Sequence, residues 1–168
     1  AYSSEDVIHF PAGLVGLPDL RRWLVLDAGG GSPLRWFQSL DRGEFSFPVL
    51  PPQFFRPDYR VTAGSPGLPA GTEPAACWTF IVTTVHPGSE VLTGNLLAPL
   101  VIDKTSRRGV QTTLDDARYG VRHEIDYVKF GLAENTDSSD NGDAAGSATA
   151  ENPAGPEAAV EIPEPAGV

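Results

Sequence analysis

The chain contains one cysteine, Cys77, and no methionine among its 168 residues. A single cysteine cannot form a disulfide within the chain, which is typical of proteins from a reducing compartment. No apolar run approaches the roughly 18 residues that a membrane-spanning helix needs. Residues 1–6 lack the basic stretch followed by an apolar stretch that marks a secretory signal. These absences predict a cytoplasmic protein with no membrane-embedded part.

Basic residues are few and scattered. The chain has 12 Lys and Arg against 22 Asp and Glu, a formal net charge of -10. No basic cluster is larger than the pairs Arg21-Arg22 and Arg107-Arg108. Binding to nucleic acid requires a basic patch, so we expect no direct contact with nucleic acid.

The end of the sequence differs sharply in composition from the rest. From Ala133 to Val168 there is no aromatic residue, no Lys and no Arg, but there are eight acidic residues. The rest of the chain therefore holds 14 acids and 12 bases, a net charge of only -2. So polar a tail cannot bury a core. We predict one folded domain over residues 1–130 and a disordered acidic tail over residues 131–168.

Short apolar runs separated by Pro and Gly are typical of β-strands. We predict one strand at Trp23–Asp27 and a hairpin formed by Leu34–Leu40 and Phe45–Leu50. The clearest strand is Ala76–Val85, which is apolar on both faces near its middle and is therefore expected to be central and covered on both sides. No long stretch has the 3.6-residue apolar period of an amphipathic helix. The predicted fold class is all-β.

The run from Thr93 to Asp103 is mostly apolar but has Pro99 in its middle. Proline donates no ladder hydrogen bond, so it belongs at a strand edge or at a bulge. We predict a second hairpin made of Asn95–Ile102 and Val110–Leu114. An edge or bulged strand with an apolar flank is a place where another chain can dock, which favours a protein-binding function over a catalytic one.

No constellation of side chains indicates catalysis or metal binding. Three histidines lie in separate segments without metal-ligand spacing: His9, His86 and His123. Cys77 begins the predicted central strand, where a small buried residue is expected rather than a reactive thiol. Asp115 and Asp116 are adjacent and point to opposite faces of an extended backbone. We expect no catalytic residue, no metal and no cofactor.

Two adjacent aromatic residues, Phe54 and Phe55, stand beside prolines. On extended backbone they cannot both enter one core. Either one of them is exposed at a rim, where aromatic side chains anchor protein partners, or both pack over an irregular turn.

Four blocks of this sequence resemble the FliW family of bacterial flagellar assembly factors. The blocks are Phe10–Gly16 with Asp19–Arg22, Trp36–Asp41, Pro52–Tyr59, and Asn95–Ile102 with Arg107–Gln111 and Leu114–His123. They span about residues 7–125 in the family's order. The Gly/Pro-rich loop Gly64–Pro74 and the acidic tail depart from the family pattern.

The resemblance implies a single compact antiparallel β-barrel-like domain without a cofactor. It also implies two protein partners, flagellin and CsrA. FliW-like proteins hold newly made flagellin in the cytoplasm, and CsrA represses translation of flagellin mRNA. In the family scheme, export of flagellin releases FliW, which then binds and antagonises CsrA so that translation resumes. We expect the free protein to be a monomer.

Five residues are the predicted partner contacts: Phe54, Phe55, Tyr59, Asn95 and Pro99. The interpretation places Asn95 and Pro99 on an edge strand, with Asn95 donating to a partner backbone. Two other functions stay open. One is a flagellin secretion chaperone without affinity for CsrA. The other is a small β-barrel hydrolase or flavin-binding split barrel, for which the sequence shows no acid/base pair and no phosphate site.

Overall fold

The computed structural model describes residues 2–126 and residue 128. In this part the chain forms β-strands and short 3-10 turns and no α-helix, which confirms the all-β prediction. The elements are η1 (Ser4–Asp6), β1 (Ile8–His9), β2 (Arg22–Asp27), β3 (Arg35–Ser39), β4 (Ser46–Leu50), η2 (Pro52–Phe54), η3 (Pro74–Ala76), β5 (Cys77–Val85), β6 (Val91–Gly94), β7 (Leu100–Asp103), β8 (Gly109–Gln111) and β9 (His123–Asp126). The predicted acidic tail lies outside the described residues, and the predicted division of the chain at residue 130 stays a prediction.

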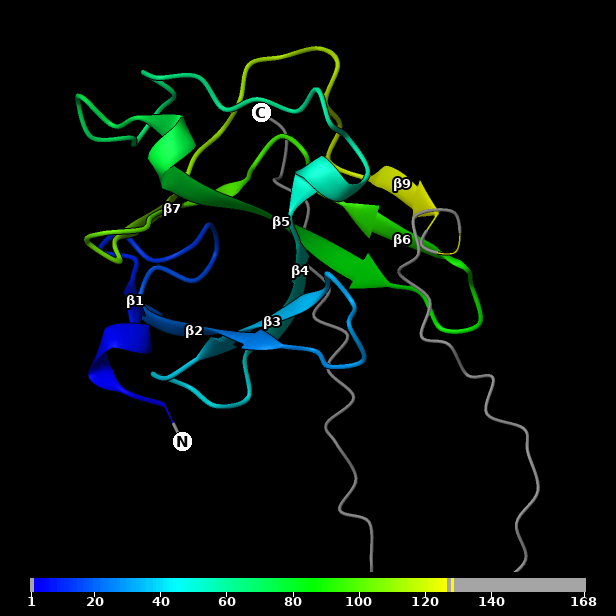
Figure 1. Ribbon diagram of the computed structural model, residues 1–168, viewed down its shortest axis with the longest axis horizontal. Helices are drawn as coiled ribbons and strands as arrows, with labels where there is room; N and C mark the ends of the chain where they lie inside the picture. The colour runs from blue at the N-terminus through cyan, green and yellow to red at the C-terminus, as the bar shows by residue number, and fades with distance from the viewer. Residues whose placement is uncertain (1, 127, 129–168) are drawn as a thin grey trace, which may run out of the picture. The chain divides into compact units, whose positions relative to one another are not determined.

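The first five strands pair in sequence order as an antiparallel sheet (Figure 1). The hairpin expected before residue 50 is present, because β3 pairs with β4 and Phe37 lies opposite Phe47. Phe37 also stacks on Trp23 of β2, with ring centroids 4.6 Å apart. Aromatic pairs on neighbouring strands stabilise a sheet beyond the area they bury.

Strand β5 is the centre of the fold. Its residues pair with three strands: Cys77–Phe80 with β7, Ile81 and Val82 with β4, and Thr83–Val85 with β6. The predicted central strand is therefore confirmed. The sheet also curls, because His9 of β1 donates its backbone N–H to the Arg107 carbonyl (2.9 Å) just before β8. This contact joins β1 to the β7–β8 hairpin and gives the predicted barrel-like form.

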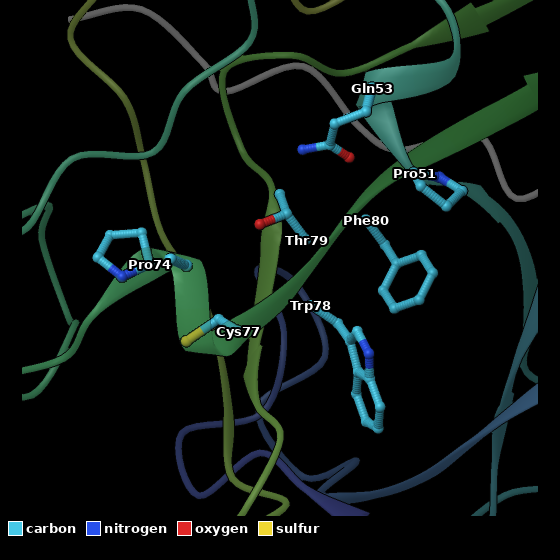
Figure 2. A pocket seen from close by; sticks show the side chains of 8 residues that line it. Pro51, Gln53, Pro74, Cys77, Trp78, Thr79 and Phe80 are labelled. Atoms are coloured by element: carbon cyan, nitrogen blue, oxygen red, sulfur yellow. The ribbon is translucent and has the colours of Figure 1, made fainter. Parts of the chain in front are cut away.

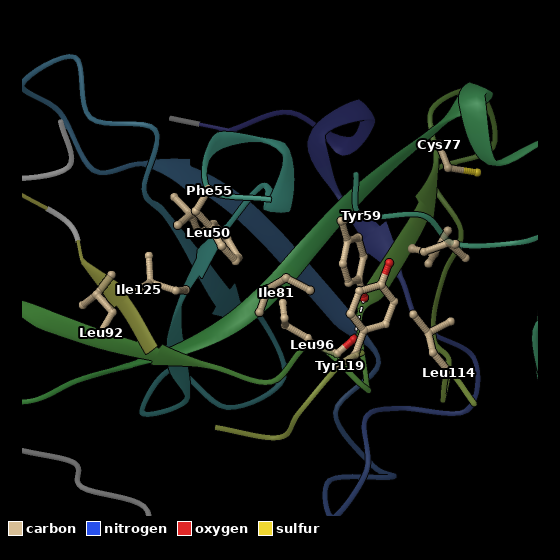
Figure 3. Close-up of a cluster of buried hydrophobic side chains, with 12 residues drawn as sticks. Leu50, Phe55, Tyr59, Cys77, Ile81, Leu92, Leu96, Leu114, Tyr119 and Ile125 are labelled. Atoms are coloured by element: carbon tan, nitrogen blue, oxygen red, sulfur yellow. Dashed lines mark hydrogen bonds between the residues drawn. The ribbon is translucent and has the colours of Figure 1, made fainter. Parts of the chain in front are cut away.

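Two hydrophobic clusters cover the two faces of this curled sheet. The first contains the barrel interior, with the fully buried Phe10, Trp23 and Phe37. The second packs on the other face of β4 and β5 (Figure 3), and its largest members are Phe55, Tyr59 and Tyr119 from the irregular segments. Alternating residues of β5 enter the two clusters, which is why both faces of this strand read as apolar.

The structure corrects the expected strand Asn95–Ile102. Only Leu100–Asp103 is strand, and residues 95–99 form a bulge-like insertion between β6 and β7, both of which pair with β5. The Asn95 side chain shapes this insertion, since its Oδ1 accepts hydrogen bonds from the backbone N–H groups of Leu97 and Ala98. Asparagine favours such turns because its carbonyl imitates a backbone acceptor.

The edge position predicted for Pro99 is wrong. The Pro99 carbonyl accepts a hydrogen bond from Thr112 N, and the Leu97 carbonyl accepts one from Leu114 N. These two bonds continue the β7–β8 ladder past the end of β8, so another strand of this chain already covers the segment. Relative to β5, residues 95–99 are extra, because Gly94 lies opposite Thr83 and Leu100 opposite Phe80. The proline lies in this bulge, the other of the two positions that its missing N–H allows.

Strands β6 and β9 have no counterpart in the sequence-based expectations. Each has four residues, too few for a period-2 pattern to stand out from its surroundings. They pair with each other, with Leu92 opposite Ile125, and both of these side chains are buried in the second cluster. The pairing joins segments about thirty residues apart in the chain, and this contact rather than local propensity makes them strands.

Candidate functional site

The predicted contact residues Phe54 and Phe55 lie in and after the short turn η2. The turn follows Pro51-Pro52, and Phe55 N donates to the Pro52 carbonyl at 3.1 Å. Because the backbone coils here, the two adjacent rings point in different directions. Phe54 is 53% exposed, whereas Phe55 is 7% exposed and belongs to the second cluster. Of the two arrangements left open by the sequence, the structure has one ring outside and one inside.

Phe55 joins η2 to strand β9. Its ring stacks on the imidazole of His123 with centroids 5.9 Å apart. Burial lowers the pKa of His123, and the nearby Arg56 guanidinium lowers it further. A neutral imidazole against an apolar ring is the form that this environment favours. Figure 1 shows η2, the cyan turn, beside β9.

Tyr59, unlike Phe54, is buried. It is 1% exposed, and its hydroxyl donates to the Leu96 carbonyl at 2.6 Å. Its ring packs on Tyr119 with centroids 4.6 Å apart. Burial, followed by proximity to Tyr119, raises the pKa of Tyr59. The hydroxyl is therefore a hydrogen-bond donor that holds the 95–99 insertion in place (Figure 3).

We expect Tyr59→Phe to lower the free energy of unfolding by about 1–3 kcal/mol, because the buried Leu96 carbonyl loses its hydrogen bond. Urea denaturation followed by tryptophan fluorescence measures this change. Tyr2→Phe removes the hydroxyl of an exposed tyrosine and is the matched control. Equal stability of the two variants would contradict the structural role of the Tyr59 hydroxyl.

Asn95 and Pro99 contribute differently from the expectation. Asn95 is half-buried, and its side-chain oxygen is engaged in the turn described above, while Pro99 is buried. Phe54 is the one member of the predicted set that exposes a large apolar side chain. Partner binding by the five residues stays a prediction, with Phe54 as its best placed candidate.

The segments around Phe55 and Tyr119 also carry a network of charged side chains that the sequence analysis did not identify. Arg56 Nε lies 3.1 Å from Asp58 Oδ1, and Arg118 Nη2 lies 2.7 Å from Asp116 Oδ2. The Arg118 side chain also reaches Asp58, at 3.9 Å. The hydrogen bonds from Arg118 lower the pKa of Asp116 to about 2. Both guanidinium groups lie over the ring of Tyr119, at 5.5 and 5.4 Å from its centroid.

This network brings together two of the sequence blocks, residues 52–59 and 114–123. Asp116 Oδ1 also accepts a hydrogen bond from Arg118 N, so Asp116 shapes a turn. Both blocks contain Arg, Asp and Tyr, and this was the one sequence signal that their charged side chains could form ion pairs with each other. Because exposed ion pairs contribute little stability, the main effect of the network is to order these charged side chains around Tyr119.

Cys77 lines a shallow depression of about 280 Å³ (Figure 2). Its Sγ lies 3.6 Å from the Glu73 carbonyl. Burial, and then the Asp103 carboxylate, raise the pKa of the thiol. A thiol in such a place stays protonated and is a poor nucleophile, so the expected structural role of Cys77 agrees with its environment.

Residues 2–126 and 128 contain no group of three or more His, Cys, Asp and Glu arranged to hold a metal ion. In the same part of the chain, no helix has the length and apolar character needed to cross a membrane.

Comparison with known proteins identifies the family. The model of the FliW protein family matches residues 1–125. The flagellar assembly factor FliW of Caldanaerobacter subterraneus subsp. tengcongensis is 32% identical over 127 residues, covering 74% of this chain and 85% of the relative. FliW of Treponema denticola is 32% identical over 123 residues, covering 72% of this chain and 83% of the relative.

A solved structure supports the fold independently. The crystal structure of a flagellar assembly factor FliW superposes with a TM-score of 0.64 at 22% identity, covering 73% of this chain and 87% of the other. At this identity the match concerns the fold alone. The matched family model and the curated relatives span the blocks that carry the resemblance, and the chain belongs to the FliW family.

Proposed function

We propose that this protein is a cytoplasmic flagellar assembly factor that binds flagellin and, once flagellin is exported, binds and antagonises CsrA. Membership of the FliW family carries the first part, because the curated relatives are named flagellar assembly factors. The two partners come from the family scheme. In this scheme the protein converts the amount of unexported flagellin into the rate of flagellin translation.

The observation that best supports a protein-binding surface is the exposed ring of Phe54. The chain on its C-terminal side is anchored in the core, since Phe55 follows it directly and is buried, and Tyr59 a few residues later is also buried. Aromatic side chains that are ordered before binding contribute strongly to protein interfaces, because little conformational entropy is lost on contact. Arg56 and Asp58, which form an ion pair, follow Phe54 within four residues of the chain and are the kind of polar groups that surround interface cores.

We propose that flagellin and CsrA compete for overlapping surfaces that include Phe54. Competition requires a negative coupling between the two binding free energies, and this coupling is reciprocal. Flagellin then weakens CsrA binding by the same factor by which CsrA weakens flagellin binding. A partner switch follows from mass action, without a large conformational change in the FliW protein itself.

The test is a calorimetric titration of this protein with the CsrA-type regulator, repeated after saturation with flagellin from the same genome. We expect binding in the first titration and its loss in the second. A ternary complex with undiminished affinities would contradict competition. Binding of flagellin without any binding of CsrA would instead establish a flagellin secretion chaperone. Absence of both interactions would overturn the proposal.

A variant makes the same experiment specific to the surface. Phe54→Ala is expected to weaken binding of both partners at least tenfold, a loss of about 1.4 kcal/mol or more. Trp36→Ala is the control, because Trp36 is an exposed aromatic on β3. Equal affinities of the two variants would exclude Phe54 from the shared surface.

A further inference from the structure

A second candidate site lies at the mouth of the barrel-like sheet, and Phe54 is not among the residues that line it. It is a cavity of about 420 Å³ between the N-terminal segment, β2, β3, β5 and the β7–β8 turn. Its walls include apolar side chains and two cations: Ile8, Val25, Trp78, Phe80, Arg35 and Arg107. Figure 2 shows that Trp78 and Phe80 project from the same side of β5, opposite Thr79. Barrel mouths of this size and composition are common ligand sites.

The two arginines of this barrel-mouth cavity differ in how they are satisfied. Arg35 donates to the carbonyls of Ser32 and Leu34, at 2.6 and 2.8 Å, and lies 3.4 Å from the Asp27 carboxylate. Arg107 forms no salt bridge and donates no side-chain hydrogen bond to the described residues. Its guanidinium lies over the ring of Trp78, 4.7 Å from the centroid. The guanidinium of Arg107 therefore has N–H groups available to donate hydrogen bonds to a ligand.

The backbone of Arg107 is held in an uncommon conformation. Its φ is +56°, and it is the one non-glycine residue with positive φ in the described chain. The turn is fixed around it, since Asp103 Oδ1 accepts from Thr105 N and Ser106 N, and the Arg107 carbonyl accepts from His9 N. A left-handed arginine costs about 1–2 kcal/mol relative to glycine. Such strain often accompanies a functional position.

Asp6, an acid that also lines the cavity, forms no salt bridge with Arg107 among the described residues. Asp6 Oδ2 accepts from the backbone N–H and the hydroxyl of Ser3, at 2.7 and 3.0 Å. These hydrogen bonds are the main reason for the lowered pKa of Asp6, and attraction to Arg107 contributes least. The carboxylate is therefore engaged in its own turn, which leaves the mouth with an unpaired positive group.

The outer edge of β2 beside the cavity offers backbone groups as well. Strand β1 covers only Arg22 and Trp23, and no described strand pairs with that edge from Leu24 to Asp27. The Arg21 carbonyl accepts from Phe10 N on this edge, whereas the Arg22 carbonyl accepts from Leu40 N on the β3 side. Since backbone groups alternate along a strand, the N–H and C=O of Val25 face the uncovered edge.

We propose that the barrel mouth binds an extended peptide segment of a protein partner in which an apolar side chain and a carboxylate are separated by one residue. The segment pairs with the edge of β2 at Val25, as in other strand-addition complexes. Residues two apart in an extended peptide share one face. The apolar side chain enters the cavity against Trp78 and Phe80, and the carboxylate accepts hydrogen bonds from Arg107. A planar guanidinium suits a single carboxylate in this way.

The test uses the full chain and the peptide acetyl-Thr-Phe-Thr-Glu-Thr-amide, followed by NMR. We call this the Glu peptide. We expect saturable shifts of the Trp78 indole N–H and of the Val25 amide. The Gln peptide, acetyl-Thr-Phe-Thr-Gln-Thr-amide, lacks the carboxylate and is expected to have an affinity lower by a factor of about ten or more. Absence of shifts at these two residues, or equal affinity for both peptides, would overturn the proposal.

Arg107→Gly separates the role of the side chain from folding. Glycine accepts positive φ without strain, so the variant is expected to keep its melting temperature while it loses the preference for the Glu peptide. Arg107→Asn, which also tolerates this conformation, serves if the glycine variant is unstable. Arg108→Ala removes the same charge from the adjacent exposed position, outside the cavity, and is expected to bind normally. Loss of the preference in Arg108→Ala, or its retention in Arg107→Gly, would assign the selectivity to general charge.

Discussion

Phe55→Ala is expected to lower the free energy of unfolding by about 3–5 kcal/mol, the range for removal of a buried phenylalanine ring. Phe54→Ala is expected to change it by less than about 0.5 kcal/mol, as for most exposed positions. The two residues are adjacent and chemically identical. They differ because η2 turns one ring into the second cluster and leaves the other in solvent.

The measurement is thermal and urea denaturation of both variants beside the unmodified protein. For a domain of this size, the Phe55→Ala change corresponds to a decrease in melting temperature on the order of 10 °C or more. The second readout is partner affinity, which Phe54→Ala is expected to reduce. If Phe55→Ala remained as stable as the unmodified protein, the packing of this ring on His123 would not contribute as the geometry indicates.

Gly13→Ala is expected to lower the free energy of unfolding by about 2–5 kcal/mol. Gly13 has a φ of +68°, and a Cβ atom there would lie 2.5 Å from the Leu17 carbonyl oxygen and 2.6 Å from the backbone of Pro18. A positive φ alone costs a non-glycine residue about 1–2 kcal/mol, and overpacking adds about 1–3 kcal/mol. Backbone atoms cannot rotate away from the clash, so the loop between β1 and β2 has to shift.

Gly16→Ala is the matched control in the same loop. Gly16 also has positive φ, at +79°, but nothing lies within 4 Å of a Cβ atom built there. We expect this variant to show only the conformational cost of about 1–2 kcal/mol. Urea denaturation of both variants measures the difference between them. Equal effects would mean that the loop relaxes freely around residue 13.

The agreement between sequence and structure is best where a strand has a long, strong local pattern. The residues of β5 alternate between two apolar faces, and both faces are covered, as expected. The β3–β4 hairpin follows from two apolar runs around a short polar turn. These features depend on neighbours within about ten residues, which a single sequence displays.

The errors lie where long-range pairing decides the structure. Nothing local in Val91–Gly94 or His123–Asp126 marks these segments as partners, yet β6 and β9 exist because they pair. Pro99 showed correctly that a regular central ladder was impossible, but it did not show which of its two permitted positions applied. The pairing of β6 and β7 with the same strand decided in favour of the bulge, because Gly94 lies opposite Thr83 and Leu100 lies opposite Phe80.

The sequence by itself determined the all-β class, the positions of most strands and, through four spaced blocks, the FliW family. The tertiary structure alone decided that Phe54 faces solvent while Phe55 faces the core, and that the Arg56–Asp58 and Arg118–Asp116 pairs meet around Tyr119. The physical reason is one of range. Strand propensity and apolar period act between near neighbours in the chain, whereas the direction of a side chain in an irregular turn depends on which distant residues pack against it.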